Sequence, residues 1–264
     1  RLILFVPTAF GVSIFIFVML HTIPGDYATA LLIGSPEAQI NASEEDFERV
    51  REQLGLNGSL PSQYVHWLGD FFKGDFGTSW TNRRPVLDRM APRIMLSLEL
   101  GILAVTIACV LGTVGGVIAA VRQDTWVDYV LRFVSMAFQA MPVFWMALIV
   151  IVVLIALFQW IPPISYRHIW EDPVRNFQVL FLPALLVGSR SSAEILRMTR
   201  SSVLEVLRED YVRTAEAKGL RKVHILGVHV LRNALIPVVT LAGFEVVFLM
   251  SGQVITEQVF NLPG

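Results

Sequence analysis

The sequence has 264 residues, of which 54% are hydrophobic and 16% are charged, whereas about 25% of the residues of an ordinary soluble domain are charged. The formal net charge is −1, so no global basic field favours nucleic acid as a partner. The single cysteine, Cys109, lies inside an apolar run, which excludes an internal disulfide and a cysteine metal site. This composition indicates a protein that is solvated by lipid.

The apolar residues gather in five runs, each close to the ~20 residues that a helix needs to cross a hydrocarbon core of about 30 Å. A backbone in lipid has to satisfy its own hydrogen bonds, and the runs lack the alternation of barrel strands, so we expect each run to be a helix. The predicted spans are residues 2–23, 94–121, 129–161, 179–196 and 234–255. The expected fold class is therefore all-α, a polytopic transmembrane domain over residues 1–264.

Residues 24–93 form a polar segment between the first two spans. Ser43 followed by acidic residues predicts the start of a short surface helix, and residues 57–61 predict a turn. Further on, residues 64–72 are amphipathic and indicate an interfacial helix or a lid on the spans. The residues near its apolar face are Tyr64, Val65, Leu68, Phe71 and Phe72.

The orientation follows from the loop at residues 197–232, which is the most basic of the short loops. It contains Arg197, Arg200, Arg208, Arg213, Lys218, Arg221, Lys222 and Arg232. Because Lys and Arg favour the cytoplasmic side, we expect this loop and the N-terminus to be cytoplasmic and residues 24–93 to be outside. The last residues then lie outside as well, so we expect a sixth span beyond them.

Catalytic motifs are absent from the sequence. It has no phosphate-binding loop, no H-E-x-x-H and no nucleophile elbow. The five histidines do not share a metal-binding spacing, and His224 and His229 are five residues apart, off the i,i+4 face of an α-helix. We therefore predict no catalytic residue, no metal ligand and no enzymatic activity in this chain.

Residues 210–220 in the basic loop resemble a short, self-contained helix. Asp210 can serve as the N-cap, Lys218 suits the C-terminal end of the helix dipole, Gly219 can adopt the left-handed cap, and Leu220 can close it. A short capped helix on a cytoplasmic loop is suited to docking against another protein.

The surroundings of this helix support docking. Ahead of it, Val203, Leu207 and Tyr211 share a helical face, whereas Ala215 and Ala217 offer small surfaces that let another backbone come close. The alternative is a basic helix that binds anionic lipid headgroups. Four acidic residues dilute the basic charge, which disfavours that alternative: Glu205, Glu209, Asp210 and Glu216.

Five motifs in the same order resemble the peptide/nickel class of ABC importer permeases, and specifically its first-permease branch. They are Ile23-Pro24-Gly25-Asp26; Gly74-Asp75-Phe76-Gly77-Thr78-Ser79 with Arg84-Pro85-Val86; Asp210-Tyr211-Val212-Arg213-Thr214-Ala215-x-Ala217-Lys218-Gly219; Leu231-Arg232-Asn233-Ala234-Leu235-Ile236-Pro237-Val238-Val239; and Val259-Phe260-Asn261-Leu262-Pro263-Gly264. The sequence departs from the general importer signature, since Arg213 and Thr214 stand where that pattern has Glu and Ala. Arg232 likewise stands where it has Pro.

The resemblance implies the type I permease fold in the inner membrane of a prokaryote. It implies import of dipeptides or oligopeptides delivered by an external binding protein, together with a second homologous permease and two cytoplasmic ATPases that bind ATP and Mg, so that this chain needs no cofactor. It also implies that the ATPases receive the loop helix, through Asp210, Tyr211, Arg213, Thr214, Ala215, Ala217, Lys218, Gly219 and Leu220. The alternatives are import of nickel or another small solute, a secondary transporter driven by an ion gradient, and a structural scaffold.

Ionisable residues at membrane depth are candidates for the translocation path, because burying them unpaired is costly. Glu245 is the best candidate because it is in the middle of the fifth span. Glu99 is either a path residue or an interfacial one. Glu194 is a path residue or the partner of Arg190 in an i,i+4 ion pair. Separately, the glycines at 112, 115 and 116 favour close helix packing.

Overall fold

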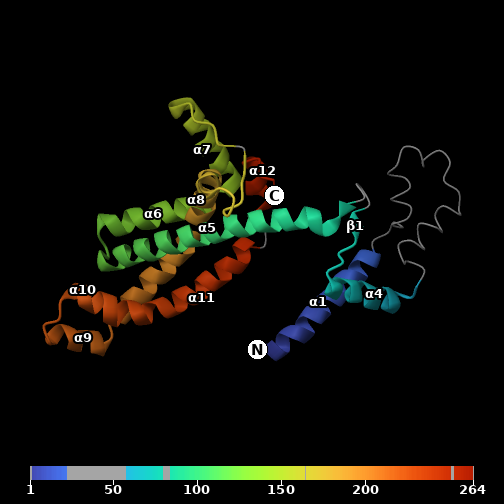
Figure 1. Cartoon of the computed structure of the whole chain (residues 1–264). Coiled ribbons are helices and arrows are strands. Elements are labelled where there is room, and N and C mark those ends of the chain that lie inside the picture. The colour runs from blue at the N-terminus through green and yellow to red at the C-terminus, as the bar shows by residue number, and fades with distance from the viewer. Residues whose placement is uncertain (1, 23–57, 80–83, 164, 251–252, 264) are drawn as a thin grey trace. The chain divides into compact units, whose positions relative to one another are not determined.

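The computed structural model describes residues 2–22, 58–79, 84–163, 165–250 and 253–263, which are mainly helical (Figure 1). The chain divides into two compact units, Arg1–Met90 and Ala91–Gly264. The predicted surface helix after Ser43 and the motif that begins at Ile23 lie outside the described residues.

In the first unit, α1 (Leu2–Thr22) packs against α4 (Leu60–Lys73). The Tyr64 hydroxyl lies 2.7 Å from the Ser13 hydroxyl, and the rings of Phe17 and Tyr64 meet edge to face. The predicted amphipathic helix is therefore present and contacts the first span, most of whose side chains stay exposed. Val65 and Phe72 are exposed and do not share the face that contacts α1. The two short strands β1 (Thr78–Ser79) and β2 (Arg84–Pro85) pair antiparallel after this helix.

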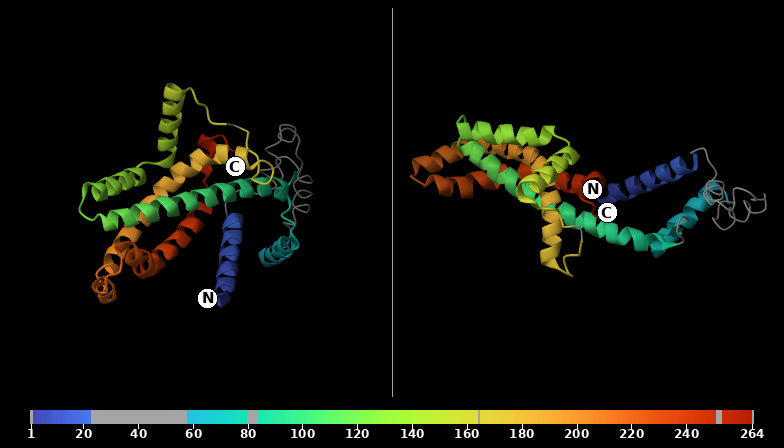
Figure 2. Two further views of the ribbon diagram at one scale, coloured as in Figure 1. Left: turned by 60° about the vertical axis from the view of Figure 1, so that its left-hand side comes forward. Right: turned by 90° about the horizontal axis from the view of Figure 1, so that it is seen from above.

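The second unit is a helical bundle built around α8 (Pro173–Val206), which packs against α6, α7 and α11. Helix α5 (Val86–Val121) begins in the first unit and continues into the second. The other helices of the second unit are α6 (Trp126–Ala140), α7 (Val143–Phe158), α9 (Asp210–Ala217), α10 (Lys222–His224), the π-helix η1 (Ile225–Val230), α11 (Leu231–Met250) and α12 (Val254–Val259). Figure 1 and the turned views of Figure 2 show α9 and α10 together at one end of this unit, where α8 ends and α11 begins.

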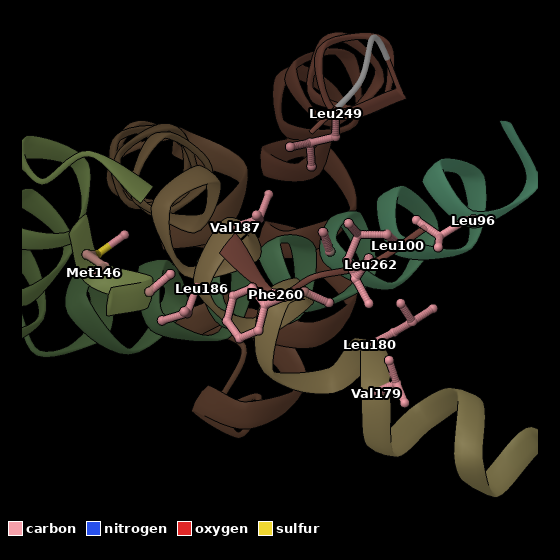
Figure 3. Packing of buried hydrophobic residues seen from close by; sticks show 13 residues of the cluster. Leu96, Leu100, Met146, Val179, Leu180, Leu186, Val187, Leu249, Phe260 and Leu262 are labelled. Atoms are coloured by element: carbon pink, nitrogen blue, oxygen red, sulfur yellow. The ribbon is translucent and has the colours of Figure 1, made fainter. Parts of the chain in front are cut away.

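The main core cluster lies toward the other end, where α5, α8 and α11 meet the segment after α12. Figure 3 shows Leu100, Leu180 and Leu249 from the three long helices around Phe260 and Leu262. The Phe260–Leu262 turn is held by an N–H of Leu262 that donates to the carbonyl of Glu257 at 2.8 Å. The end of the described chain is thus part of the core.

Glycines let α5 and α8 approach closely, as the sequence predicts. A Cβ on Gly112 would lie 2.6 Å from Ile195, and one on Gly116 would lie 2.6 Å from the Cβ of Thr199 and 2.7 Å from a backbone oxygen. A Cβ on Gly115 would be 3.0 Å from Leu196. Such gaps leave no room for a methyl group, so the contact between the two helices depends on glycine.

Four of the described helices are long and apolar enough to cross a membrane, or five if α6 and α7 are counted as one broken span. The expectation of a single third helix over residues 129–161 is wrong. It is two helices bent by 105° at Met141 and Pro142. The cause is local, because the residue before a proline avoids helical backbone angles. Met141 has φ −88° and ψ 133°, which is extended.

Other helix ends differ from the predicted spans because hydrogen bonding continues past the apolar stretch until a cap or a break stops it. α5 begins at Val86 instead of residue 94, and α8 extends beyond 179–196 at both ends. The start of α8 is fixed by Asp172, whose carboxylate accepts a hydrogen bond from the backbone N–H of Arg175 at 3.0 Å. The fifth predicted span ends early, since α11 stops at Met250 and Ile255 belongs to α12.

Candidate coupling site and translocation path

The C-terminal cap of α9 has the predicted geometry. Gly219 has a φ of 77°, in the left-handed region. Its N–H donates to the carbonyl of Glu216 at 2.9 Å, and the N–H of Leu220 donates to the carbonyl of Ala215 at 3.3 Å. This pair of bonds is the Schellman motif, which stops the helix and satisfies its last carbonyls.

The N-terminus of α9 differs from the prediction. Glu209, with φ −69° and ψ 144°, is the capping residue and makes no side-chain cap bond, whereas Asp210 is the first helical residue. The helix from α8 also breaks at residues 207–209, so Val203, Leu207 and Tyr211 do not share one continuous helical face. Val203 is buried and Tyr211 is exposed.

The two faces of α9 are clearly distinct. Val212 and Ala215 are buried in a cluster with Val203, Ile225 and Val230, so Ala215 offers no surface to a partner and that part of the prediction is wrong. An i,i+3 spacing put Ala215 under Val212 on the inner face, a pairing that the sequence reasoning overlooked. The outward residues are exposed: Asp210, Arg213, Thr214, Glu216, Ala217 and Lys218.

Tyr211 connects α9 to the start of α11. Its hydroxyl accepts a hydrogen bond from the Asn233 amide at 2.9 Å and lies 3.4 Å from the carbonyl of His229. His229 belongs to η1, in which hydrogen bonds run from i to i+5. That winding brings His224 and His229 onto neighbouring positions, with ring centroids 5.9 Å apart, whereas an α-helix would have separated them. No group of three or more potential metal ligands occurs among the described residues.

A buried ion pair that the sequence reasoning missed joins α6 to α8. Asp128 is fully buried, and its carboxylate accepts two hydrogen bonds from the Arg200 guanidinium, at 2.8 and 2.7 Å, and one from the N–H of Asp124 at 3.1 Å. The sequence places Arg200 among the loop charges, because the fourth predicted span ends at residue 196. The extension of α8 to Val206 is what turns Arg200 toward α6.

Next to this ion pair, a groove of about 520 Å³ lies between the end of α8 and the start of α9. Its walls carry both signs of charge. They are formed by Arg200, Ser201, Leu204, Glu205, Arg208, Glu209 and Asp210.

In the middle of the bundle, Glu245 of α11 is 9% exposed. The Ser191 hydroxyl of α8 hydrogen bonds to its carboxyl, and the charges of Arg190 and Glu194 act on it. One carboxylate oxygen, Oε2, is buried without a hydrogen-bond partner. The best path candidate from the sequence therefore lies inside the bundle, on the α8 side of α11.

The predicted ion pair between Arg190 and Glu194 does not occur among the ion pairs of the described residues. Glu194 instead accepts a hydrogen bond from the Gln139 amide at 3.0 Å, and Gln139 in turn accepts one from Arg197. An i,i+4 spacing permits a pair but does not select it when a polar residue on a neighbouring helix is closer. These contacts tie α6 to α8.

Glu99 is occupied by the segment that precedes α8. Its carboxylate accepts hydrogen bonds from the Tyr166 hydroxyl at 3.0 Å and from the Asn176 amide, and lies 3.3 Å from Nδ1 of His168. Burial and the neighbouring Glu99 carboxylate raise the pKa of Tyr166 above its ordinary value. These contacts show Glu99 as an anchor for that segment, and its role in the path stays a prediction.

A second buried carboxylate, Glu257 of α12, was not predicted. It accepts a hydrogen bond from the Ser97 hydroxyl of α5 at 2.7 Å and is only 4% exposed. It lies just before the motif that begins at Val259, and none of the sequence patterns described above includes it.

The spanning helices, the capped loop helix and the buried charges define a membrane permease, and the chain belongs to the family of binding-protein-dependent transport system inner membrane components. Residues 112–264 match that family, and residues 1–101 match its N-terminal component. The chain is therefore a multi-pass inner-membrane protein and the permease subunit of an ATP-driven importer. This decides against a carrier driven by an ion gradient and against a structural scaffold.

Among its relatives is the glutathione transport system permease protein GsiC of Escherichia coli strain K12. The two are 38% identical over 264 residues, which is 100% of this chain and 82% of that relative. The proteins of the same description from Shigella dysenteriae serotype 1 (strain Sd197) and Shigella boydii serotype 4 (strain Sb227) have the same identity and coverage.

Proposed function

We propose that this chain is the first of two homologous permeases that together import short peptides. An external binding protein delivers the peptide, and two cytoplasmic ATPases, which bind ATP and Mg, drive its passage. The similarity to GsiC carries the cargo proposal, because GsiC is a glutathione transport system permease protein and glutathione is a tripeptide. The N-terminus and the loop that holds α9 are on the cytoplasmic side in this proposal.

The ATPase docks on the exposed face of α9. That face is polar and bears one small residue, Ala217, whereas Val212 and Ala215 fix the opposite face in the bundle. The helix is closed at its C-terminus by the Gly219 cap, so a push on it need not melt it. A rigid element with one buried and one free face is suited to receiving a partner without losing its own fold.

Two connections carry a displacement of α9 into the membrane. The first is the buried cluster around Val212, which includes Val203 of α8 and Val230 of η1. The second is the hydrogen bond between Tyr211 and Asn233 of α11. Movement of α9 would therefore bias α8 and α11 together, and these are the helices that enclose Glu245.

Reconstitution tests this function. The chain, its second permease and the ATPases are placed in proteoliposomes with the binding protein inside or outside, and uptake of radiolabelled di- and tripeptides is compared with uptake of nickel. We expect peptide uptake that needs ATP hydrolysis and stops with an ATPase variant that binds but does not hydrolyse ATP. Nickel uptake without peptide uptake would replace the proposed cargo with the metal ion.

A further inference from the structure

The Glu245 carboxylate is incompletely satisfied inside the bundle. Three buried side-chain atoms lack a hydrogen-bond partner among the described residues, namely Arg132 Nε, Thr199 Oγ1 and Glu245 Oε2. Only the last belongs to a group that can carry a negative charge. An ionised oxygen without a partner at this depth is far more costly than a neutral one, so an occupant that donates hydrogen bonds is expected there.

The groups around Glu245 determine which occupant fits. Within the part of the chain that the structure describes, Ser191 is the one side chain that hydrogen bonds to the carboxyl. Glu194 adds a second negative charge against the single positive charge of Arg190. Glu194 already accepts a hydrogen bond from Gln139, and so is held on the α6 side. The local excess of one negative charge favours a cation, and the free oxygen favours one with N–H donors.

An ammonium group meets both conditions. It is compact, carries one positive charge and presents N–H donors that can bond to Glu245 Oε2 and to neighbouring oxygens. A Ca²⁺ or Mg²⁺ ion stripped of its water would need about six or more oxygen ligands, whereas the groups that act on Glu245 are Ser191, Glu194 and the cationic Arg190. The free amino terminus of a peptide is an ammonium group.

We propose that Glu245, with Ser191 beside it, binds the ammonium group of the cargo during passage and so selects for cargo with a free amino group. This inference rests on the proposed import of peptides. It assigns Glu245 a direct contact with cargo, whereas its neighbours on α8 position the carboxylate. Cargo without that ammonium leaves the oxygen unpaired and passes more slowly.

Carbodiimide labelling tests the contact on the unaltered protein. The complete importer in nanodiscs is treated with dicyclohexylcarbodiimide, and modification of Glu245 is followed by mass spectrometry. We expect labelling in the empty importer and at least about fivefold slower labelling when the importer is trapped with vanadate during turnover of a tripeptide. The N-acetylated tripeptide, added to the same nanodiscs at the same concentration, should leave labelling unchanged.

Two results would overturn the proposal. Failure to label Glu245 in the empty importer would show that the carboxylate is already paired, for example with a basic side chain of the second permease. Equal labelling with and without the tripeptide, in an importer that demonstrably takes it up, would show that the cargo does not reach this residue. If the unaltered importer takes up no peptide at all, the proposed function fails first and the two failures are thereby distinguished.

Uptake by variants provides the second measurement. Glu245→Gln should lower uptake of the free tripeptide about tenfold, and Glu245→Asp should retain more of it because the charge remains. Glu171→Gln removes an exposed carboxylate elsewhere in the same unit and should leave uptake unchanged. Equal uptake by Glu245→Gln and Glu171→Gln would count against ammonium binding.

Discussion

Removing one partner of the Asp128–Arg200 ion pair should weaken the bundle more than any single surface change. In Asp128→Ala, the Arg200 guanidinium, which is 17% exposed, loses both of its hydrogen bonds to the carboxylate. It then remains largely buried without the carboxylate that was hydrogen-bonded to it, and the charge of Asp124 still acts on it. Breaking a buried pair in this way costs about 3–5 kcal/mol, and the small exposure of Arg200 places the expected loss near the lower end, about 3 kcal/mol.

The assay is thermal unfolding in detergent. The protein is heated, and the fraction that still elutes as a monodisperse peak is measured. The penalty comes from the uncompensated charge of Arg200 and not from lost attraction alone, so removing both charges should cost less than removing one. In the double variant Asp128→Leu with Arg200→Met, both charges are gone, so most of the stability should return. Arg208→Met, a change at an exposed position nearby, is the control and should have little effect.

A double variant that is as unstable as the sum of the two single variants would refute this reasoning. Additive losses would mean that each residue acts through independent contacts, as distant sites do. The pair would then not be the main connection between α6 and α8 at this end of the bundle.

Ala217→Trp should abolish co-purification with the ATPase while membrane insertion stays normal, because this position faces outward on α9; normal co-purification would count against docking there. Tyr211→Phe should leave the ATPase bound but raise the number of ATP molecules hydrolysed per peptide imported, since a hydrogen bond worth about 1 kcal/mol between α9 and α11 is lost. An unchanged number of ATP molecules per peptide would show that Tyr211 does not couple α9 to α11. Gly116→Leu should cost at least about 2 kcal/mol in thermal unfolding because its Cβ would clash with α8, whereas Gly101→Ala, with its nearest neighbour at 3.6 Å, should be tolerated. Because the pKa of Tyr166 is raised in the folded state, its contribution to stability is complete below the ordinary tyrosine pKa of about 10 and is lost as the pH rises through the higher folded-state pKa. The absorbance titration of the native protein minus that of Tyr166→Phe should therefore show no phenolate near pH 10. A phenolate in that difference near pH 10 would contradict the raised pKa.

The elements that depend on local chemistry could be predicted from the sequence. The cap at Gly219 follows from a residue type that alone adopts positive φ at little cost, and the glycines of α5 mark a close helix contact for the same lack of a side chain. The apolar runs located the spanning helices because lipid imposes a simple length rule. In each case the decisive information lies within a few residues of the chain.

The predictions that were wrong concern contacts with residues that are distant in sequence. Whether Glu194 pairs with Arg190 or with Gln139 is decided by the approach of α6, which no spacing in α8 reveals. The inward orientation of Ala215 depends on the packing of α9 against η1 and α8. The break at Pro142 could have been predicted from the proline itself, but the apolar run continues through it and indicates one long helix.

The π-helix at Ile225–Val230 also sets the rotational phase of α11. Each of its turns accommodates more residues than an α-turn, so the side chains that follow are displaced around the helix axis relative to an uninterrupted α-helix. Adding or removing one residue in a helix rotates everything beyond it by about 100° and shifts it by about 1.5 Å. Deleting Gly227 from η1 would therefore turn Glu245 away from Ser191 by about 100° without altering any residue in the membrane.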